Sequence, residues 1–301
     1  MAIAHYLKEI GRGKHSARAL SREQARDLFG QLLDGALSDL ELGAFCIAMR
    51  VKGETPQEMA GFLDATQERV QPLAACDRPV MVLPSYNGAR KLPLLTPLLA
   101  LLLAREGLAV LVHGAASESS RVFTSEVLAA LGIHPQTSAS PLAGGRVSFL
   151  PTDLLCPGLQ RLLDVRRVLG LRNPAHSLVK MLNPVRGPSL VVASYTHPQY
   201  ARLMADTFTL TAANAMLLRA TEGEPVADPR RMPQMDGFLA GRQLALEPAQ
   251  SGPVEALGEL PMGCETPATA RYIRAVMAAE LPVPAPIAQQ VAHLLQMGAQ
   301  L

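Results

Sequence analysis

Residues 79–112 read PVMVLPSYNGARKLPLLTPLLALLLAREGLAVLV. Two short apolar runs, Val80–Leu83 and Leu108–Val112, have the length of buried strands. The segment between them, Leu94–Arg105, is apolar over the length of a helix. A strand, a helix and a second strand are typical of a parallel sheet, because parallel neighbours need a long crossover connection. The stretch therefore predicts an α/β fold.

The same alternation continues toward the C-terminus. Further runs of strand length are Val147–Leu150, Leu190–Ala193 and Met216–Leu218. The predicted helices are Ser119–Leu131, a segment from Pro198 to about Thr207, and two C-terminal helices that open at Thr266-Pro267 and at Pro284–Pro286. Residues 222–261 are rich in Gly and Pro, which predicts loops and short strands.

The chain before Pro79 has a different pattern. Three segments carry the signature of a capping box, in which Ser or Thr precedes Gln or Glu by one helical turn. They are Ser21 with Gln24, Ser38 with Glu41, and Thr55-Pro56 with Glu58. Gly35 and Gly53 mark the ends of the first two helices. The sequence thus predicts an α/β protein with a small N-terminal helical domain plus a larger α/β domain, whose mostly parallel central sheet is flanked by helices.

Composition excludes several classes of protein. The chain has 301 residues, 49% of them hydrophobic, and a formal net charge of +2. The four cysteines form no CxxC pair, which argues against a zinc site and a disulfide framework. Met1–Glu9 lacks the apolar core of a signal peptide, and the apolar run Leu92–Ala104 is too short to span a bilayer. We expect a soluble cytoplasmic protein with no membrane partner.

Positive charge is concentrated in two segments. Between Asp164 and Asp206 there is no Asp or Glu, and this interval holds Arg166, Arg167, Arg172, Lys180, Arg186 and Arg202. A second segment, Lys8–Arg26, contains six cations and two acids. Lys and Arg without a local counter-charge favour a polyanion, because they release condensed counterions from phosphates. The alternative is a solvated surface, or pairing with acids distant in sequence.

Several motifs resemble the anthranilate phosphoribosyltransferase family. They are Gly43–Lys52 with Gly53-Glu54-Thr55, the strand end Val112-His113-Gly114, the helix Ser119–Gly132, the run Arg166–Asn173 (RRVLGLRN), and Leu182-Asn183-Pro184. The resemblance covers nearly the whole chain. It implies a helical domain formed by residues 1–74 with 166–184, and an α/β domain formed by residues 75–165 and 185–301.

The phosphoribosyl-donor motifs of that family are degenerate here. The family's Gly-Thr-Gly-Gly-Asp loop is replaced by Pro84–Gly88, and only Thr96 remains of the following Asn-Ile-Ser-Thr segment. The Lys-His-Gly-Asn-Arg motif keeps His113-Gly114 but loses both cations, and residues 222–225 hold no adjacent acidic pair for magnesium. We therefore predict no catalytic residues, metal or cofactor. The predicted degenerate donor site is Ser85, Asn87, Gly88, Thr96, His113 and Gly114.

Three segments resemble a divergent branch of the family. They are Glu9–Lys14, Arg172–Lys180 and Thr221–Arg231. The resemblance implies a homodimer that binds nucleic acid with little preference for sequence, and DNA is the expected ligand. The predicted contact residues are Lys8, Arg12, Lys14, Arg18, Arg166, Arg167, Arg172, Lys180 and Arg202. Two alternatives remain open: a phosphoribosyltransferase with a divergent donor site that holds an aromatic carboxylate at Arg166 and Arg167, and a small-ligand sensor.

Overall fold

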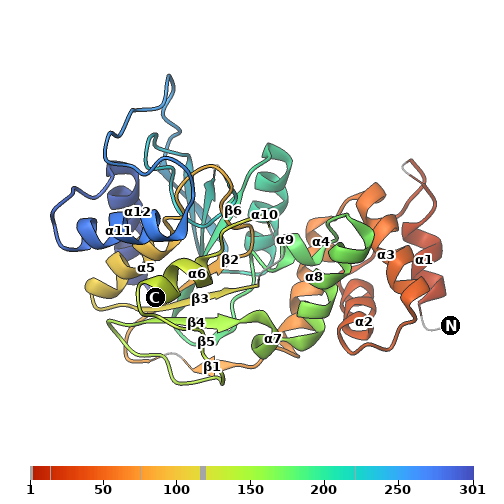
Figure 1. The fold of residues 1–301 in the computed structure, drawn as a ribbon. Coiled ribbons are helices and arrows are strands. Elements are labelled where there is room, and N and C mark those ends of the chain that lie inside the picture. The colour runs from red at the N-terminus through yellow and green to blue at the C-terminus, as the bar shows by residue number, and fades with distance from the viewer. Residues whose placement is uncertain (1–2, 14, 75, 116–119, 221) are drawn as a thin grey trace.

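The computed structural model describes residues 3–13, 15–74, 76–115, 120–220 and 222–301. It has a helical domain beside a larger α/β domain (Figure 1). The helical domain contains α1 (Ala4–Ile10), α2 (Arg22–Leu33), α3 (Asp39–Lys52), α4 (Pro56–Gln67) and, from later in the chain, α8 (Pro157–Leu169) and α9 (Ala175–Leu178). The predicted fold class is confirmed.

The α/β domain is built on one mostly parallel sheet. Its strands are β2 (Val80–Ser85), β3 (Ala109–Gly114), β4 (Val147–Pro151), β6 (Ser189–Tyr195), β7 (Ala215–Arg219), β8 (Met235–Leu239) and β9 (Arg242–Glu247). In the described residues the strand order is β4-β3-β2-β6-β7-β8-β9. The strands from β4 to β7 are parallel, and β8 and β9 add antiparallel neighbours at one edge.

Alternate residues of the buried strands enter two different cores. Met81 and Leu83 pack with the cluster that covers one face of the sheet, whereas Val80 and Val82 pack with the cluster on the other face. The first face is covered by α5 (Thr96–Arg105), α6 (Thr124–Ala130), α11 (Thr266–Met277) and α12 (Ala285–Gly298). The second face is covered by α10 (Pro198–Leu210), and its core continues into the helical domain.

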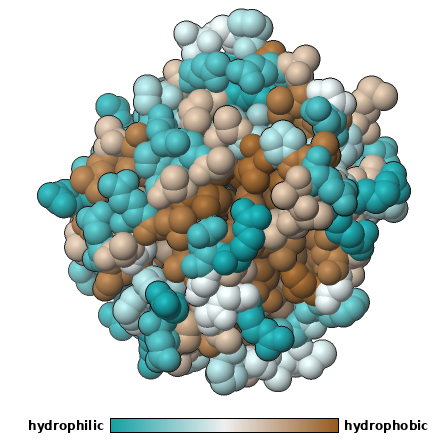
Figure 2. Space-filling model, turned by 90° about the vertical axis from the view of Figure 1, so that its left-hand side faces the viewer, coloured by the Kyte–Doolittle hydropathy of each residue, from teal (hydrophilic) through white to brown (hydrophobic). Residues whose placement is uncertain are grey.

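The outer end of the α/β domain lies opposite the helical domain (Figure 1). Figure 2 views this end, and its hydrophobic side chains are interspersed with hydrophilic ones. No helix among the described residues is both long and apolar enough to cross a membrane.

Most of the local predictions hold. All three capping boxes are present, and Gly53 is the C-cap of α3. The predicted helix Ser119–Leu131 is shorter, because α6 begins at Thr124, and Ser119 lies outside the described residues. The sequence predicted neither α1 nor α8, and it did not predict the short parallel pair of β1 (Leu73–Ala74) with β5 (Val185–Arg186). Two-residue strands are too short to show a hydrophobic period.

The first turns of helix α8 pack against the end of α2 in the helical domain. Gly158 lies against Leu33, since a Cβ atom at Gly158 would be 2.1 Å from the Leu33 carbonyl oxygen. The Arg161 guanidinium donates to the carbonyl of Leu32 at 2.7 Å. The predicted domain boundary at residue 166 falls inside this helix, and the division into domains stays a prediction.

Glu58 ties the helical domain together from inside. Its side chain is fully buried, and its Oε1 atom accepts the N–H of Leu20 at 2.9 Å. Its Oε2 atom accepts the backbone N–H and the hydroxyl of Thr55 and lies 2.6 Å from the Lys52 ammonium. Lys52 also donates to the Gly53 carbonyl at 2.7 Å. One carboxylate thus fixes the start of α4, the end of α3 and the segment before α2.

Removing this carboxylate should destabilise the domain. We expect Glu58→Ala to lower the free energy of unfolding by roughly 3 kcal/mol, because it leaves the buried Lys52 without its counter-ion. The measurement is urea denaturation followed by circular dichroism. Glu41→Ala is the matched control, since Glu41 has the same position in an exposed capping box and should cost about 1 kcal/mol. Equal losses would contradict the central role of Glu58.

Candidate functional site

The carboxyl ends of the parallel strands carry the candidate site. The strand β2 ends at Ser85 and has β3 on one side and β6 on the other. It is therefore the switch point of the sheet, where ligands bind in open α/β folds. The predicted donor-site residues Asn87 and Gly88 follow β2 directly, and His113 and Gly114 end β3.

Glu224 fills the loop that follows β2. Its Oε1 atom accepts the backbone N–H groups of Asn87 and Gly88, both at 2.8 Å. Its Oε2 atom accepts the hydroxyl of Ser85 and, at 3.3 Å, the hydroxyl of Thr96. The side chain is 3% exposed. A carboxylate of the chain itself therefore occupies donors that could otherwise hold a phosphate.

Glu222 occupies the second half of the same loop. Its Oε2 atom accepts the N–H of Arg90 at 2.8 Å. Its Oε1 atom accepts the N–H of Lys91 at 2.8 Å and that of Leu92 at 3.1 Å. Three successive backbone donors thus converge on one carboxylate, as they do in anion-binding nests. We call Glu222 and Glu224 the glutamate lock.

Gly223 allows the glutamate lock to approach the loop. Its φ is +81°, and a Cβ atom there would lie 1.8 Å from Nδ2 of Asn87, so a side chain would strain the backbone and displace the Asn87 amide. The Gly223 carbonyl accepts hydrogen bonds from the Lys180 ammonium at 3.1 Å and from the Ser194 hydroxyl at 2.8 Å. Lys180, predicted to contact nucleic acid, is therefore buried beneath the loop.

Burial shifts the pKa values of Lys180 and Glu224. It lowers the pKa of Lys180 to about 8, although the nearby Glu224 opposes the shift. It raises the pKa of Glu224, and this shift is opposed by the hydrogen bonds from Ser85, Gly88 and Asn87 and by Lys180. These donors stabilise the carboxylate form, which is the form that holds the loop closed.

Tyr86 and His113 fill the space beside the lock. The Tyr86 hydroxyl lies 2.7 Å from Nδ1 of His113 and accepts the Thr152 hydroxyl at 2.9 Å. The other ring nitrogen of His113, Nε2, lies 3.1 Å from the Leu182 carbonyl. Burial lowers the pKa of His113 to about 4, so the imidazole is neutral near pH 7. Both ring nitrogens have partners, which makes His113 a structural residue.

A cleft of about 690 Å³ opens beside the lock, between the two domains. Lys180 and Ser194, which bind the Gly223 carbonyl, form part of its lining. The cationic and imidazole side chains of the lining are Arg50, Arg172, Lys180, His176 and His197. Among the described lining residues Glu54 is the one carboxylic acid, and burial raises its pKa, which weakens its negative charge. The cleft therefore favours an anionic ligand.

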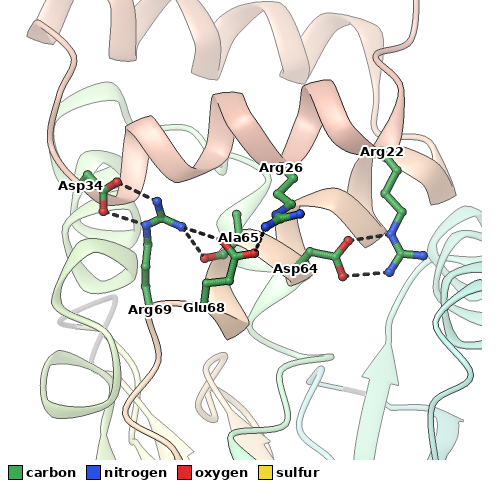
Figure 3. Close-up of polar contacts among 7 residues, drawn as sticks. All are labelled: Arg22, Arg26, Asp34, Asp64, Ala65, Glu68 and Arg69. Carbon is green, nitrogen blue, oxygen red and sulfur yellow. Dashed lines mark hydrogen bonds and ion pairs between the residues drawn. The ribbon is translucent and has the colours of Figure 1, made fainter.

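The basic edge of α2 is neutralised by α4. Figure 3 shows Arg22 bound to both carboxylate oxygens of Asp64, at 2.6 and 2.8 Å, and Arg26 paired with Glu68. Arg69 makes a similar bidentate contact with Asp34. These guanidinium groups serve helix packing, which is the alternative that the sequence left open for this segment.

The predicted contacts before α2 also have acidic neighbours. Arg12 lies 2.6 Å from Glu9, and Arg18 lies 3.7 Å from the other oxygen of the same carboxylate. Lys8 is exposed on α1. Lys14 lies outside the described residues. The first basic segment therefore carries less free charge than its sequence indicates.

The second basic segment is divided by the fold. Arg172 and Lys180 line the cleft. Arg166 and Arg167 lie in the last turn of α8, where Arg167 is 3.3 Å from Asp164, and Arg202 is exposed on α10. Sequence reasoning missed Arg50 and His197 in the cleft and the glutamate lock, because their partners are distant in the chain.

Comparison with known proteins places this geometry in a family. The chain is 38% identical over 303 residues to the uncharacterized protein YbiB of Escherichia coli K12, with 96% of this chain and 92% of YbiB covered. It is 32% identical over 273 residues to the anthranilate phosphoribosyltransferase of Sorangium cellulosum So ce56, with 86% of this chain and 76% of that enzyme covered. The chain belongs to the anthranilate phosphoribosyltransferase family. Residues 4–70 match the helical bundle domain of the glycosyl transferase family.

Solved structures of the family have the same fold. The anthranilate phosphoribosyltransferase of Thermus thermophilus aligns with a TM-score of 0.74 at 23% identity, and covers 97% of this chain and 87% of that one. The enzyme of Saccharomyces cerevisiae in complex with PRPP and Mg aligns with a TM-score of 0.71 at 14% identity, and covers 99% and 89%. This protein thus keeps the family fold around a loop that its own carboxylates close.

A magnesium ion does not fit the glutamate lock. The Glu222 oxygens receive three N–H groups, and the Glu224 oxygens receive two N–H groups and two hydroxyls. A divalent cation needs these oxygen atoms as ligands. No group of three His, Cys, Asp or Glu suitable for a metal occurs among the residues that the structure describes.

The lock should stabilise the folded protein. We expect Glu224→Ala to lower the free energy of unfolding by roughly 3 kcal/mol, because it leaves buried donors and the Lys180 ammonium without an acceptor. Urea denaturation measures this loss. Glu222→Ala is the control, since Glu222 is less buried, and it should cost about 1 kcal/mol. A negligible loss for Glu224→Ala would contradict the lock.

Proposed function

We propose that this protein is a homodimer that binds nucleic acid with little sequence preference and uses the interdomain cleft as its binding surface. The observation that carries the proposal is the charge of the cleft: Arg50 and Arg172 line it, and Glu54 is the one carboxylic acid among its described lining residues. Guanidinium groups match phosphates in bidentate geometry, and ammonium groups act as point charges. Such contacts position a strand without reading its bases.

The cleft also offers surfaces for bases. Tyr200 belongs to its lining, together with the imidazole of His197. Aromatic rings stack on any base, so they support binding without sequence preference. Arg202, from the predicted contact set, is exposed on α10 and extends the positive charge beyond the cleft.

The glutamate lock argues against phosphoribosyl transfer. A donor with a diphosphate would have to displace two carboxylates that are part of the same chain and hold seven hydrogen-bond donors. Saturable binding of phosphoribosyl diphosphate with magnesium in calorimetry would support the transferase alternative.

An apolar stripe on α3 supports the homodimer. Leu40, Ile47 and Val51 are 84%, 43% and 52% exposed, and their spacing of seven and four positions puts them on one face of the helix. The exposed Ala44 lies in the same stripe. A second copy of the chain is the occupant we propose, because a self-complementary apolar patch is the usual basis of a twofold dimer.

Arg172 provides the test of nucleic-acid binding. We expect Arg50→Glu/Arg172→Glu to weaken binding of labelled DNA at least about tenfold and to lower the salt slope by about 0.7 for each single-strand phosphate that the variant no longer binds. Fluorescence anisotropy at rising salt measures both quantities. Arg146→Glu/Arg242→Glu changes the same charge at the opposite, amino-terminal edge of the sheet and is the matched control. Salt-independent binding, or equal loss in the control, would overturn the proposal.

Ile47 provides the test of the dimer. We expect Ile47→Glu to yield a monomer, because a charge in the centre of the apolar stripe would be buried without a partner. Light scattering coupled to size-exclusion chromatography measures the mass. Met262→Glu, at a side chain that is 95% exposed in the α/β domain, should leave the dimer intact. A dimer that persists in Ile47→Glu would exclude this face.

A further inference from the structure

A second cavity adjoins the interdomain cleft. It has a volume of about 370 Å³ and lies at the carboxyl end of β7. Thr196, which follows β6, lines both cavities. The remaining wall comes from the end of β7 and from residues 228–234 and 249–254. We call this cavity the β7 pocket.

The β7 pocket carries unneutralised positive charge. Arg219, Arg230 and Arg231 line it together with Asp228. Asp228 binds Arg230 through two hydrogen bonds of 3.0 Å, from Nε and Nη2. Arg231 donates to the Gly252 carbonyl at 2.9 Å, which positions its guanidinium without neutralising it. Within the described residues no carboxylate lies within 4.0 Å of the guanidinium of Arg219 or Arg231.

Backbone contacts hold the walls of the pocket in place. Arg219 ends β7 in register with Tyr195 of β6, and its N–H donates to the Gln234 carbonyl at 3.3 Å. Met232 and Gln250 exchange hydrogen bonds, because the Gln250 N–H donates to the Met232 carbonyl at 3.0 Å and the Gln250 side chain accepts the Met232 N–H at 3.1 Å. These hydrogen bonds therefore fix the backbone that carries Arg219 and Arg231.

We propose that the β7 pocket binds a phosphate of a single nucleic-acid strand that leaves the interdomain cleft past Thr196. This inference rests on the proposed function. Arg219 and Arg231 would share the phosphate, since guanidinium groups form charge-assisted hydrogen bonds with phosphodiesters. A single strand can bend from one cavity into the next, whereas a duplex is stiff over roughly 150 base pairs. The pocket thus selects a flexible strand.

Strands of different length distinguish binding in the β7 pocket from binding in the interdomain cleft. The test compares oligothymidylates of about 4 and about 16 nucleotides, which span the usual range of single-strand site sizes. For the long strand we expect Arg219→Glu/Arg231→Glu to weaken binding about tenfold and to lower the salt slope by about 1.4, or about 0.7 per phosphate contact. The short strand, which fills the cleft alone, should bind as it does to the wild type.

Two further variants secure the interpretation. Arg219→Gln/Arg231→Gln removes the charge without reversing it and should give a smaller loss in the same direction. Arg146→Glu/Arg242→Glu, at the opposite edge of the sheet, should leave both strands unaffected. Circular dichroism checks that every variant is folded.

The outcomes distinguish the two proposals. If the wild type binds and Arg50→Glu/Arg172→Glu weakens binding, but Arg219→Glu/Arg231→Glu does not weaken binding of the long strand, the β7 pocket is excluded and the proposed function stands. An equal loss for both strands would also exclude the path past Thr196. If the wild type shows no salt-dependent binding to either strand, both proposals are overturned.

Discussion

Glu224 accepts two backbone N–H groups and one hydroxyl from the end of β2 and the loop after it, and a second hydroxyl from the start of α5, and the rest of the site is arranged around these contacts. An anion that is part of the chain loses no translational entropy when it binds. Its effective concentration at the loop therefore exceeds that of a free ligand. Gly223 lets the segment that carries Glu222 and Glu224 lie close to the loop after β2. Its carbonyl accepts a hydrogen bond from Lys180, which lies beneath this loop. The family fold is thus retained while its switch-point loop is closed from within.

The closed loop also holds one of the cations of the cleft. Lys180 donates to the Gly223 carbonyl, and it lines the cleft together with Arg50 and Arg172. The position of Arg50 depends on the end of α3, which Glu58 fixes through Lys52. Residues of both domains line the cleft, so its charge is a property of both domains together.

The sequence predicted the fold because its signals are local. A capping box such as Ser21 with Gln24 is completed within one turn, and the apolar runs of β2 and β3 have strand length whatever surrounds them. The parallel sheet followed from the helix-length segment between those runs. The missed elements include α1, α8 and the pair of β1 with β5. The helix α1 and the two strands are short, so their apolar pattern was too brief to be recognised. The helix α8 has 13 residues, and its signals, Pro157 in the first turn and Gly170 at the C-cap, were not used.

The charge of the site was decided by the tertiary structure. The sequence placed Lys180 among surface cations and gave no sign that the carboxylate of Glu224 would reach Gly88, which lies 136 positions earlier. Nor could it show that Arg22 would pair with Asp64, 42 positions later, or that Arg50 lines the cleft. The reason is that a helix or strand is set by neighbours in the chain, whereas the energy of a charge depends on its burial and on the distance to its partner through space.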